Sequence, residues 1–276
     1  MMLEKIKPLK SFGQNFLKDK NIANKIIDLL GEISNKNVIE IGPGMGALTE
    51  LLLKKNTNLT AFDIDERAIE YLKTKFSNEA NLKIIHSDIR DVNLEKHTVD
   101  KTLLIGNIPY NITNDIIFWL FEQRNFLSKA VLTIQREVAE RYVAKPKTKN
   151  YGITTVALQL YASAKIAFHI SPTAFYPVPK VTSSVLVIDF SVQNNYCEVD
   201  KKQILQLVKA AFSQRRKVVG NSIKSYLSDR KIDVEKLSFR LENNNSKNYL
   251  KMRAEELTVE DYVYFYDLIL RTDSDF

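Results

Sequence analysis

The sequence predicts an α/β fold: a doubly wound, mostly parallel sheet with antiparallel strands at one edge, and a small C-terminal all-helical domain. Over the first half of the chain, short apolar runs alternate with helical patterns of roughly ten residues, which is typical of parallel strands joined by right-handed crossovers. Beyond residue 190 the pattern is helical throughout, which predicts the second domain.

The sheet elements follow one another in order. A leading helix is predicted over Asn21–Leu30, where isoleucines and leucines recur at helical spacing and Gly31 supplies the C-cap. Parallel strands and the two clearest crossover helices are predicted over these ranges: strands Asn37–Ile41, Leu59–Ile64, Leu82–His86, Lys101–Gly106 and Ala130–Gln135; helices Ala47–Lys55 and Glu66–Phe76.

Two late β-rich runs break the alternation. Lys165–Ile170 and Val181–Phe190 are separated by a proline-rich segment without a helix, so we expect them to be adjacent antiparallel edge strands. The polar stretch Ser191–Asp200 is typical of a linker. We therefore expect a domain over residues 1–190, which includes a basic N-terminal segment, and a helical domain over residues 191–276.

Composition limits the class of protein. The 276 residues carry 40 Lys and Arg against 33 Asp and Glu, a net charge of +7 that favours a polyanionic partner. The sequence shows neither a run of about 18 apolar residues nor a signal peptide, so we expect a cytoplasmic protein without membrane association, by default a monomer. The single Cys197 has no partner, and His86, His97 and His169 lack ligand spacing, so we expect no metal.

A glycine-rich loop after the first predicted strand indicates a nucleotide-like cofactor. Glu40-Ile-Gly42-Pro-Gly44-Met-Gly46 stands where a strand ends and a helix begins, and its glycines permit a tight turn and close approach to a ligand. An NAD site is the main alternative, but its G-x-G-x-x-G fingerprint fails at Ala47, and an acidic residue precedes the first glycine by two positions. Both details favour S-adenosylmethionine, bound by Glu40, Gly42 and Gly44.

Two aspartates at the ends of the next strands suit the adenosine of that cofactor. Asp63 can accept hydrogen bonds from both ribose hydroxyls, and Asp88 can accept from the adenine amino group. Ile64 and Ile89 would form apolar walls for the ring, whereas we expect Asp65 to be solvated.

Asn107-Ile108-Pro109-Tyr110 follows the fourth strand and carries the predicted chemistry. An adenine N6 amine is a poor nucleophile. The Asn107 side-chain oxygen and the Ile108 carbonyl can accept hydrogen bonds from its two N–H groups and draw the nitrogen toward tetrahedral geometry. Pro109 would orient that carbonyl, and the Tyr110 ring would stack on the base. Asn107 would also border the cofactor.

These motifs resemble those of the ribosomal RNA adenine dimethyltransferase family, and the match covers almost the whole chain. Phe12-Gly-Gln-Asn15-Phe-Leu17 resembles its N-terminal signature, in which the positions of Asn15 and Leu17 contact the cofactor. The segment from Phe175 to Ser183 resembles its F-x-P-x-P-K-V-x-S motif, which implies that Phe175 stacks on the target base opposite Tyr110.

The resemblance implies a Rossmann-like class I methyltransferase sheet and dimethylation of N6 on two adjacent adenines near the 3′ end of 16S ribosomal RNA in the small subunit, during ribosome biogenesis. Phe212-Ser-Gln-Arg-Arg-Lys217 resembles the RNA-facing motif of the family's helical domain. The chain departs from the family pattern at Asp63, where glutamate is usual, and at Gly220, within a normally more basic stretch.

Two basic segments are candidate RNA contacts. One lies on and after a short helix, and the other is the basic end of the family motif; the residues are Arg136, Arg141, Lys145, Lys147 and Lys149, and Arg215, Arg216 and Lys217. Each alone is also compatible with an ordinary solvated face. Trp119 lies on an apolar helical pattern and is expected in the core.

Three other functions remain open on sequence grounds. A large-subunit RNA adenine methyltransferase of the macrolide-resistance type shares both loops, but the helical domain favours the small subunit. A DNA N6-adenine methyltransferase would leave the other motifs unexplained. A non-catalytic ribosome-assembly factor on the same scaffold is disfavoured by the intact Glu40, Gly42, Asn107 and Tyr110.

Overall fold

The computed structural model describes residues 6–9, 13–98, 100–191, 200–243 and 247–273. The chain divides into two compact units, one formed by residues 1–139 and 163–192, the other by residues 140–162 and 193–276. The later division lies two residues from the boundary expected at 190/191. The segment 140–162, which we had expected within the first domain, instead belongs with the helical unit.

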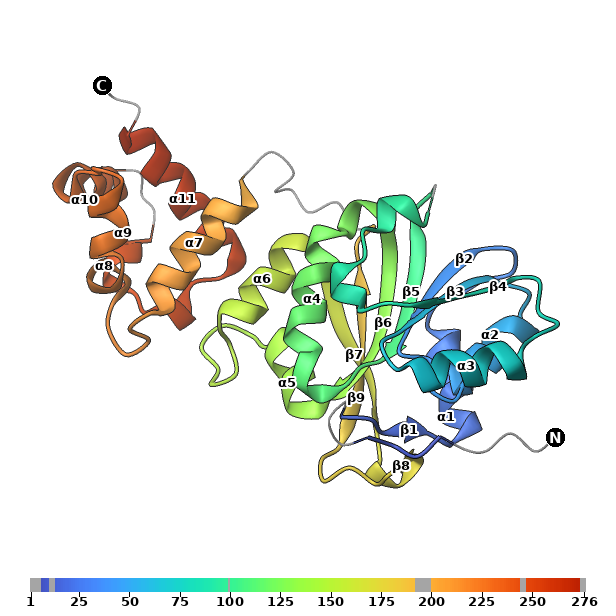
Figure 1. The fold of residues 1–276 in the computed structure, drawn as a ribbon. Helices are drawn as coiled ribbons and strands as arrows, with labels where there is room; N and C mark the ends of the chain where they lie inside the picture. Colours follow the sequence, from blue (N-terminus) through green and yellow to red (C-terminus); the bar gives the residue numbers. More distant parts are fainter. Residues whose placement is uncertain (1–5, 10–12, 99, 192–199, 244–246, 274–276) are drawn as a thin grey trace. The chain divides into compact units, whose positions relative to one another are not determined.

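A seven-stranded sheet forms the first unit, in the order β4-β3-β2-β5-β6-β9-β7 (Figure 1). Its strands are β2 (Asn37–Ile41), β3 (Asn58–Asp63), β4 (Leu82–His86), β5 (Thr102–Asn107), β6 (Leu127–Gln135), β7 (Ser163–Ile170) and β9 (Ser183–Asp189). The strands β4, β3, β2, β5 and β6 are parallel to one another, and β9 runs antiparallel to both of its neighbours, β6 and β7. The fold class and every predicted strand are confirmed, with ends shifted by three residues at most.

Apolar side chains on both sheet faces are covered by helices, as a doubly wound sheet requires. The helices are α1 (Lys20–Asp28), α2 (Ala47–Lys54), α3 (Glu66–Lys75) and α4 (Thr113–Glu122). Ile26 and Ile27 of α1 and Leu52 of α2 pack with strand residues in one buried cluster. On α4, Trp119 is buried and its indole N–H donates to the carbonyl of Val92, so its predicted core position is confirmed.

The sequence analysis did not predict a second, two-stranded sheet. β1 (Phe16–Leu17) pairs antiparallel with β8 (Phe175–Tyr176), and the amide of Lys18 donates to the carbonyl of Ala174 at 2.9 Å. Strands of two residues are too short to show alternation, which is why no pattern predicted them. Their pairing fixes the N-terminal segment beside the sheet, although Phe12 of its signature lies outside the described residues.

The described part of the second unit is helical, as expected. It contains the end of α5 (Arg136–Tyr142) and α6 (Ile153–Tyr161), α7 (Lys201–Phe212), α8 (Val219–Ser222), α9 (Lys224–Asp229), α10 (Val234–Asn243) and α11 (Val259–Asp273). Val156 and Leu160 of α6 join the buried cluster formed by the later helices, and the Tyr151 hydroxyl donates to the carbonyl of Leu257 at 2.8 Å. These contacts are the physical reason why segment 140–162 belongs to this unit.

Among the described residues, none of the helices combines the length and apolar character needed to cross a membrane.

The departure from the family pattern at Gly220 has a packing explanation within this unit. A Cβ at position 220 would lie 2.9 Å from the carbonyl oxygen of Leu250 and 3.2 Å from its Cβ. We expect Gly220→Ala to destabilise the helical unit by about 1–3 kcal/mol, because backbone must move to make room. Hydrogen exchange of α8, together with thermal unfolding, measures this.

Gly152→Ala is the control without a steric clash, since a Cβ at Gly152 would meet nothing within 4 Å; its expected cost is only the poorer N-cap that alanine gives α6. Equal effects of the two substitutions would contradict the packing explanation.

Candidate cofactor and target site

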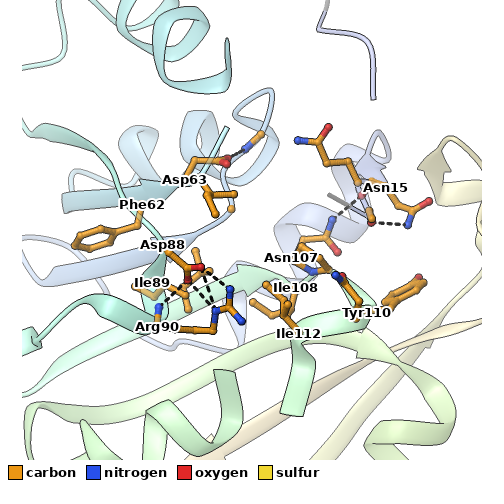
Figure 2. Close-up of a pocket in the computed structure, with 18 of the residues that line it drawn as sticks. Asn15, Phe62, Asp63, Asp88, Ile89, Arg90, Asn107, Ile108, Tyr110 and Ile112 are labelled. Carbon is orange, nitrogen blue, oxygen red and sulfur yellow. Dashed lines mark hydrogen bonds and ion pairs between the residues drawn. The ribbon is translucent and has the colours of Figure 1, made fainter. Parts of the chain in front are cut away.

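A cavity of about 260 Å³ opens at the carboxyl ends of β2, β3, β4 and β5, where the sheet reverses its winding direction (Figure 2). In parallel α/β sheets this is the edge at which ligands bind. Its lining comes from the N-terminal segment and from the loop after each of the four strands: residues 13–16, 41, 42, 44, 62–64, 87–90 and 107–112.

The glycine loop adopts a turn that other residues resist. Gly42 and Gly44 have φ angles of +64° and +53°, in the left-handed region. A Cβ on Gly44 would stand 2.7 Å from the ring of Phe16, so the absence of a side chain lets the N-terminal segment close against the loop. Both glycines line the cavity.

Asp63 occupies the predicted position at the end of β3. Its carboxylate is nearly buried and accepts from the amides of Gly44 at 3.1 Å and Asp65 at 2.9 Å. Burial raises the pKa of Asp63 more than these hydrogen bonds lower it. Because these donors are backbone amides, the side chain is held in place and can still accept from a diol in the cavity.

We expected Asp65 to be solvated, but it is buried, with only 3% of its surface exposed. The Arg67 guanidinium donates to it at 2.6 Å and the Gln14 amide at 2.8 Å. Burial raises the pKa of Asp65, but these hydrogen bonds outweigh burial and lower it overall. Since Arg67 also donates to the carbonyl of Lys7, Asp65 anchors the N-terminal segment rather than facing water.

Asp88 lines the cavity at the end of β4, but its carboxylate has a protein partner that the sequence analysis missed. Arg90 donates to it through Nη2 at 2.6 Å and through Nε (Figure 2). Arg90 also contacts Asp115 at 3.3 Å. These hydrogen bonds hold the pKa of Asp88 below its usual range. Asp88 is thus a fixed, ionised acceptor, which suits an adenine amino group.

Glu40 lies apart from the main cavity, beside a smaller one of about 30 Å³ that Gly42, Leu17 and Asn107 also line. It is 1% exposed, and the Thr49 hydroxyl donates to it at 2.7 Å. Burial, reinforced by the nearby Asp63, raises the pKa of Glu40 to about 8 although the Thr49 hydrogen bond lowers it. Its carboxyl is therefore neutral at pH 7.

Asn107 is oriented by the N-terminal segment. Its Nδ2 donates to the carbonyl of Asn15 at 2.7 Å, across 92 residues of sequence (Figure 2). Because the amide nitrogen is engaged, Oδ1 is the atom that remains to accept from a ligand in the cavity. Next to it, the amide of Ile108 donates to the carbonyl of Thr133 at 3.0 Å, which fixes the loop to β6.

The Tyr110 ring is half-buried at the cavity wall, and its hydroxyl shares a 2.8 Å hydrogen bond with the buried Ser183 hydroxyl on β9. Burial raises the pKa of Tyr110, although this bond opposes the shift. The tether restrains the ring from its far end, so that its face rather than its hydroxyl is available to a base.

Phe175 does not join this wall. Only 1% of it is exposed; it packs in the core cluster beside Leu17, its partner in the β1–β8 pairing. The stacking role that the resemblance implies for Phe175 stays a prediction, and it would require the ring to leave this packing. Its neighbour Tyr176 is 59% exposed.

The remaining predicted cofactor residues divide. Asn15, Ile64 and Ile89 line the main cavity, and Pro109 lies beside them in the loop after β5. Leu17 is buried and reaches only the smaller cavity. Two carboxylate acceptors, apolar walls and a glycine turn together fit an adenosine-bearing cofactor. Among the described residues, no group of three or more potential ligand side chains could hold a metal ion.

The candidate RNA residues divide between the units. Arg136 belongs to the first, whereas Arg141, the three lysines from 145 to 149 and the three basic residues from 215 to 217 belong to the second. Within the second unit the two basic segments lie together: Arg215 donates to the carbonyl of Lys149 at 2.9 Å.

Comparison with known proteins identifies close relatives. The family model described as "Ribosomal RNA adenine dimethylase" matches residues 6–264. A protein of Mycoplasma mobile called "Ribosomal RNA small subunit methyltransferase A" is 38% identical over 94% of this chain and 97% of its own length. A protein of the same name from Borrelia garinii is 39% identical over 94% of this chain and 88% of its own length.

Two solved structures share the fold. A dimethyladenosine transferase from Plasmodium falciparum superposes with a TM-score of 0.76 at 24% identity, covering 93% of this chain and 98% of that one. The 23S rRNA methyltransferase ErmE superposes with a TM-score of 0.68 at 21% identity, covering 92% and 99%.

The buried Glu40 predicts a pH dependence of stability in the cofactor-free protein. In the folded state its carboxyl stays protonated up to about pH 8, whereas the unfolded chain ionises it above its ordinary pKa of 4.5. Folding is therefore favoured below pH 4.5, and this stabilisation is lost as the pH rises toward 8. Glu40→Gln, which cannot ionise, should gain stability relative to the wild type across this window.

Urea unfolding of both proteins at pH 5 and pH 8.5 measures the difference. If the difference in free energy of unfolding between Glu40→Gln and the wild type were the same at both pH values, Glu40 would be ionised in the folded state, contrary to this prediction.

Proposed function

Because the chain belongs to the ribosomal RNA adenine dimethylase family, we propose that it dimethylates N6 of two adjacent adenines near the 3′ end of 16S ribosomal RNA. The methyl donor is S-adenosylmethionine. The observation that carries the proposal is Asn107, whose amide is oriented by the 2.7 Å hydrogen bond to Asn15 at the wall of a cavity that Asp63 and Asp88 also line. The small-subunit name shared by relatives at 33–39% identity supports the choice of substrate.

Residues at three strand ends would hold the cofactor. Asp63 is placed to accept from the ribose hydroxyls and Asp88 from the adenine amine, with Ile64 and Ile89 against the ring. When bound, S-adenosylmethionine supplies a methyl group activated by its positively charged sulfur. Glu40 is buried beside the smaller cavity, and a bound cation close to it would lower its pKa and favour its ionised form.

The Asn-Ile-Pro-Tyr loop would then prepare the target amine. The Asn107 oxygen and the Ile108 carbonyl accept hydrogen bonds from the two N6–H groups. These bonds pull the nitrogen out of conjugation with the ring and raise its nucleophilicity. A strong base is unnecessary before transfer, because the proton becomes acidic once the nitrogen is alkylated. After the first transfer one N–H remains, and the same acceptors can hold it for the second.

Tyr110 would hold the base itself. Its ring face stabilises the positive charge that develops on the alkylated adenine, and the Ser183 tether keeps the ring in place. Because an adenine inside a helix cannot reach this cavity, the target must leave its stack, and the basic residues would hold the flanking phosphates.

The family model and the names of the relatives support a ribosomal RNA rather than a DNA substrate. The alternatives left open by the sequence each lack a favouring observation: the large-subunit enzyme ErmE shares the fold at 21% identity, which speaks only to architecture. The intact loop around Asn107 argues against a purely non-catalytic assembly factor.

Removing the Asn107 side chain tests the mechanism. Asn107→Ala should lower kcat for methyl transfer to undermethylated small subunits by about 10²–10³-fold, because an acceptor for the N6 proton is lost. Affinity for S-adenosylhomocysteine, measured by calorimetry, should fall only a few-fold, through the lost contact to Asn15. Label from tritiated cofactor, identified as dimethyladenosine in the small subunit, measures the activity.

Undiminished transfer by this variant would refute the mechanism. Label confined to large subunits or DNA with the wild-type protein would refute the substrate.

The Tyr110 tether gives a second test. Ser183→Ala should reduce kcat about 3–10-fold, since a neutral hydrogen bond contributes about 1 kcal/mol, and should leave cofactor affinity unchanged. Ser184→Ala is the matched control: the adjacent buried serine bonds His169 instead. Equal losses of activity in both variants would point to damage to β9 rather than to the tyrosine.

A further inference from the structure

Arg215 stands first in the basic run that resembles an RNA-facing motif, yet its guanidinium is turned toward its own chain. Nε donates to the Glu255 carboxylate at 2.7 Å, and Nη2 donates to the carbonyls of Lys149 at 2.9 Å and Thr148 at 3.2 Å. Three of its five N–H donors are thus used within the helical unit. A side chain so engaged is a poor candidate for a direct phosphate ligand.

Glu255 reaches the same loop by a second route. Its carbonyl accepts from the amide of Lys147 at 2.7 Å, while the Thr148 hydroxyl donates to the carbonyl of Lys145 at 2.7 Å. Lys147 has a φ angle of +66°, a left-handed conformation that costs a side-chain-bearing residue about 1–2 kcal/mol. The loop is therefore held in a shape that the isolated segment would avoid.

The loop carries a regular set of cations. Lys145, Lys147 and Lys149 are all exposed, as are Arg216 and Lys217 on the adjoining segment. Glu255 is an acidic residue inside this basic region, where its charge alone would weaken attraction for a polyanion. Its presence is explained if its structural contribution outweighs that electrostatic cost.

We propose that Arg215 and Glu255 form a clamp that positions residues 145–149, so that Lys145, Lys147 and Lys149 meet the phosphates of the target RNA in a preformed arrangement. Arg215 is then a positioning residue, and the neighbouring Arg216 and Lys217 are the direct phosphate contacts of the motif. The proposal rests on the proposed function, in that ribosomal RNA is the polyanion. A preformed loop spares the ordering entropy that a mobile one loses on binding.

Neutralising Glu255 separates the clamp from simple electrostatics, because the two predict opposite signs. Glu255→Ala removes a negative charge from a basic surface, so Coulomb attraction alone would tighten RNA binding; loss of the clamp should instead weaken it about 3–10-fold. Glu242→Ala is the matched control, an exposed acid on α10 of the same unit, and should bind as the wild type or slightly tighter. Affinity for undermethylated small subunits across a salt series is the measurement.

Two arginine variants complete the series. Arg216→Ala should weaken binding and reduce the salt dependence by about one phosphate contact. Arg215→Ala should resemble Glu255→Ala, and the double variant should be no weaker than either single one, as expected for two residues acting through one contact. Additive losses, or tighter binding by Glu255→Ala, would overturn the proposal.

Amide hydrogen exchange of residues 145–151 in the free protein measures how firmly the clamp holds this loop in the absence of RNA. Exchange there should accelerate in Arg215→Ala and Glu255→Ala and stay unchanged in Arg216→Ala and Glu242→Ala; unchanged exchange in the first pair would overturn the clamp. Failure of the wild type to bind small subunits would overturn the proposed function instead, and the exchange data keep the two failures distinct.

Discussion

The left-handed turn at Gly42–Gly44 is the constraint on which the rest of the site depends. It brings the Gly44 amide to the Asp63 carboxylate and leaves room for the Phe16 ring where a side chain would otherwise stand. With Phe16 seated there, the Asn15 carbonyl lies within 2.7 Å of the Asn107 amide. A backbone conformation in the cofactor loop thus determines the orientation of the group expected to act on the target base.

Besides Asp88, three further carboxyl groups lie at this edge of the sheet, and the protein accommodates each differently. Asp65 is paired with Arg67, Asp63 is held by backbone amides, and Glu40 is neutral because burial raises its pKa to about 8. Holding the Glu40 carboxyl protonated above its ordinary pKa of 4.5 costs folding free energy while the site is empty. A positively charged cofactor bound nearby would lower that pKa and reduce this cost, so the site would be more stable with the cofactor bound.

Sequence patterns predicted the sheet well because the parallel strands are short, largely apolar runs of five to nine residues, most of them buried, and the site residues follow at the carboxyl ends of four of them. They failed where a contact joins distant segments. Asp65 was expected to be solvated because nothing local reveals that Gln14 returns to it. Arg90 was missed for another reason: it lies only two residues from Asp88, but the pairing of the two side chains depends on the turn geometry after β4 and not on a sequence pattern. The burial of Phe175, like the contact at Asp65, involves a distant segment, since Phe175 pairs with Leu17 of β1.

Charge runs show the same limit in the helical unit. By composition, every residue of Arg215-Arg216-Lys217 is an equivalent cation, yet only the structure shows that the first is committed to Glu255 and to two carbonyls. Gly220, which replaces a more basic residue of the family pattern, lies against the Leu250 carbonyl where a side chain has no room. The number of basic residues in such a motif therefore overestimates the number of phosphates it can meet, because some positions are required to hold the others in place.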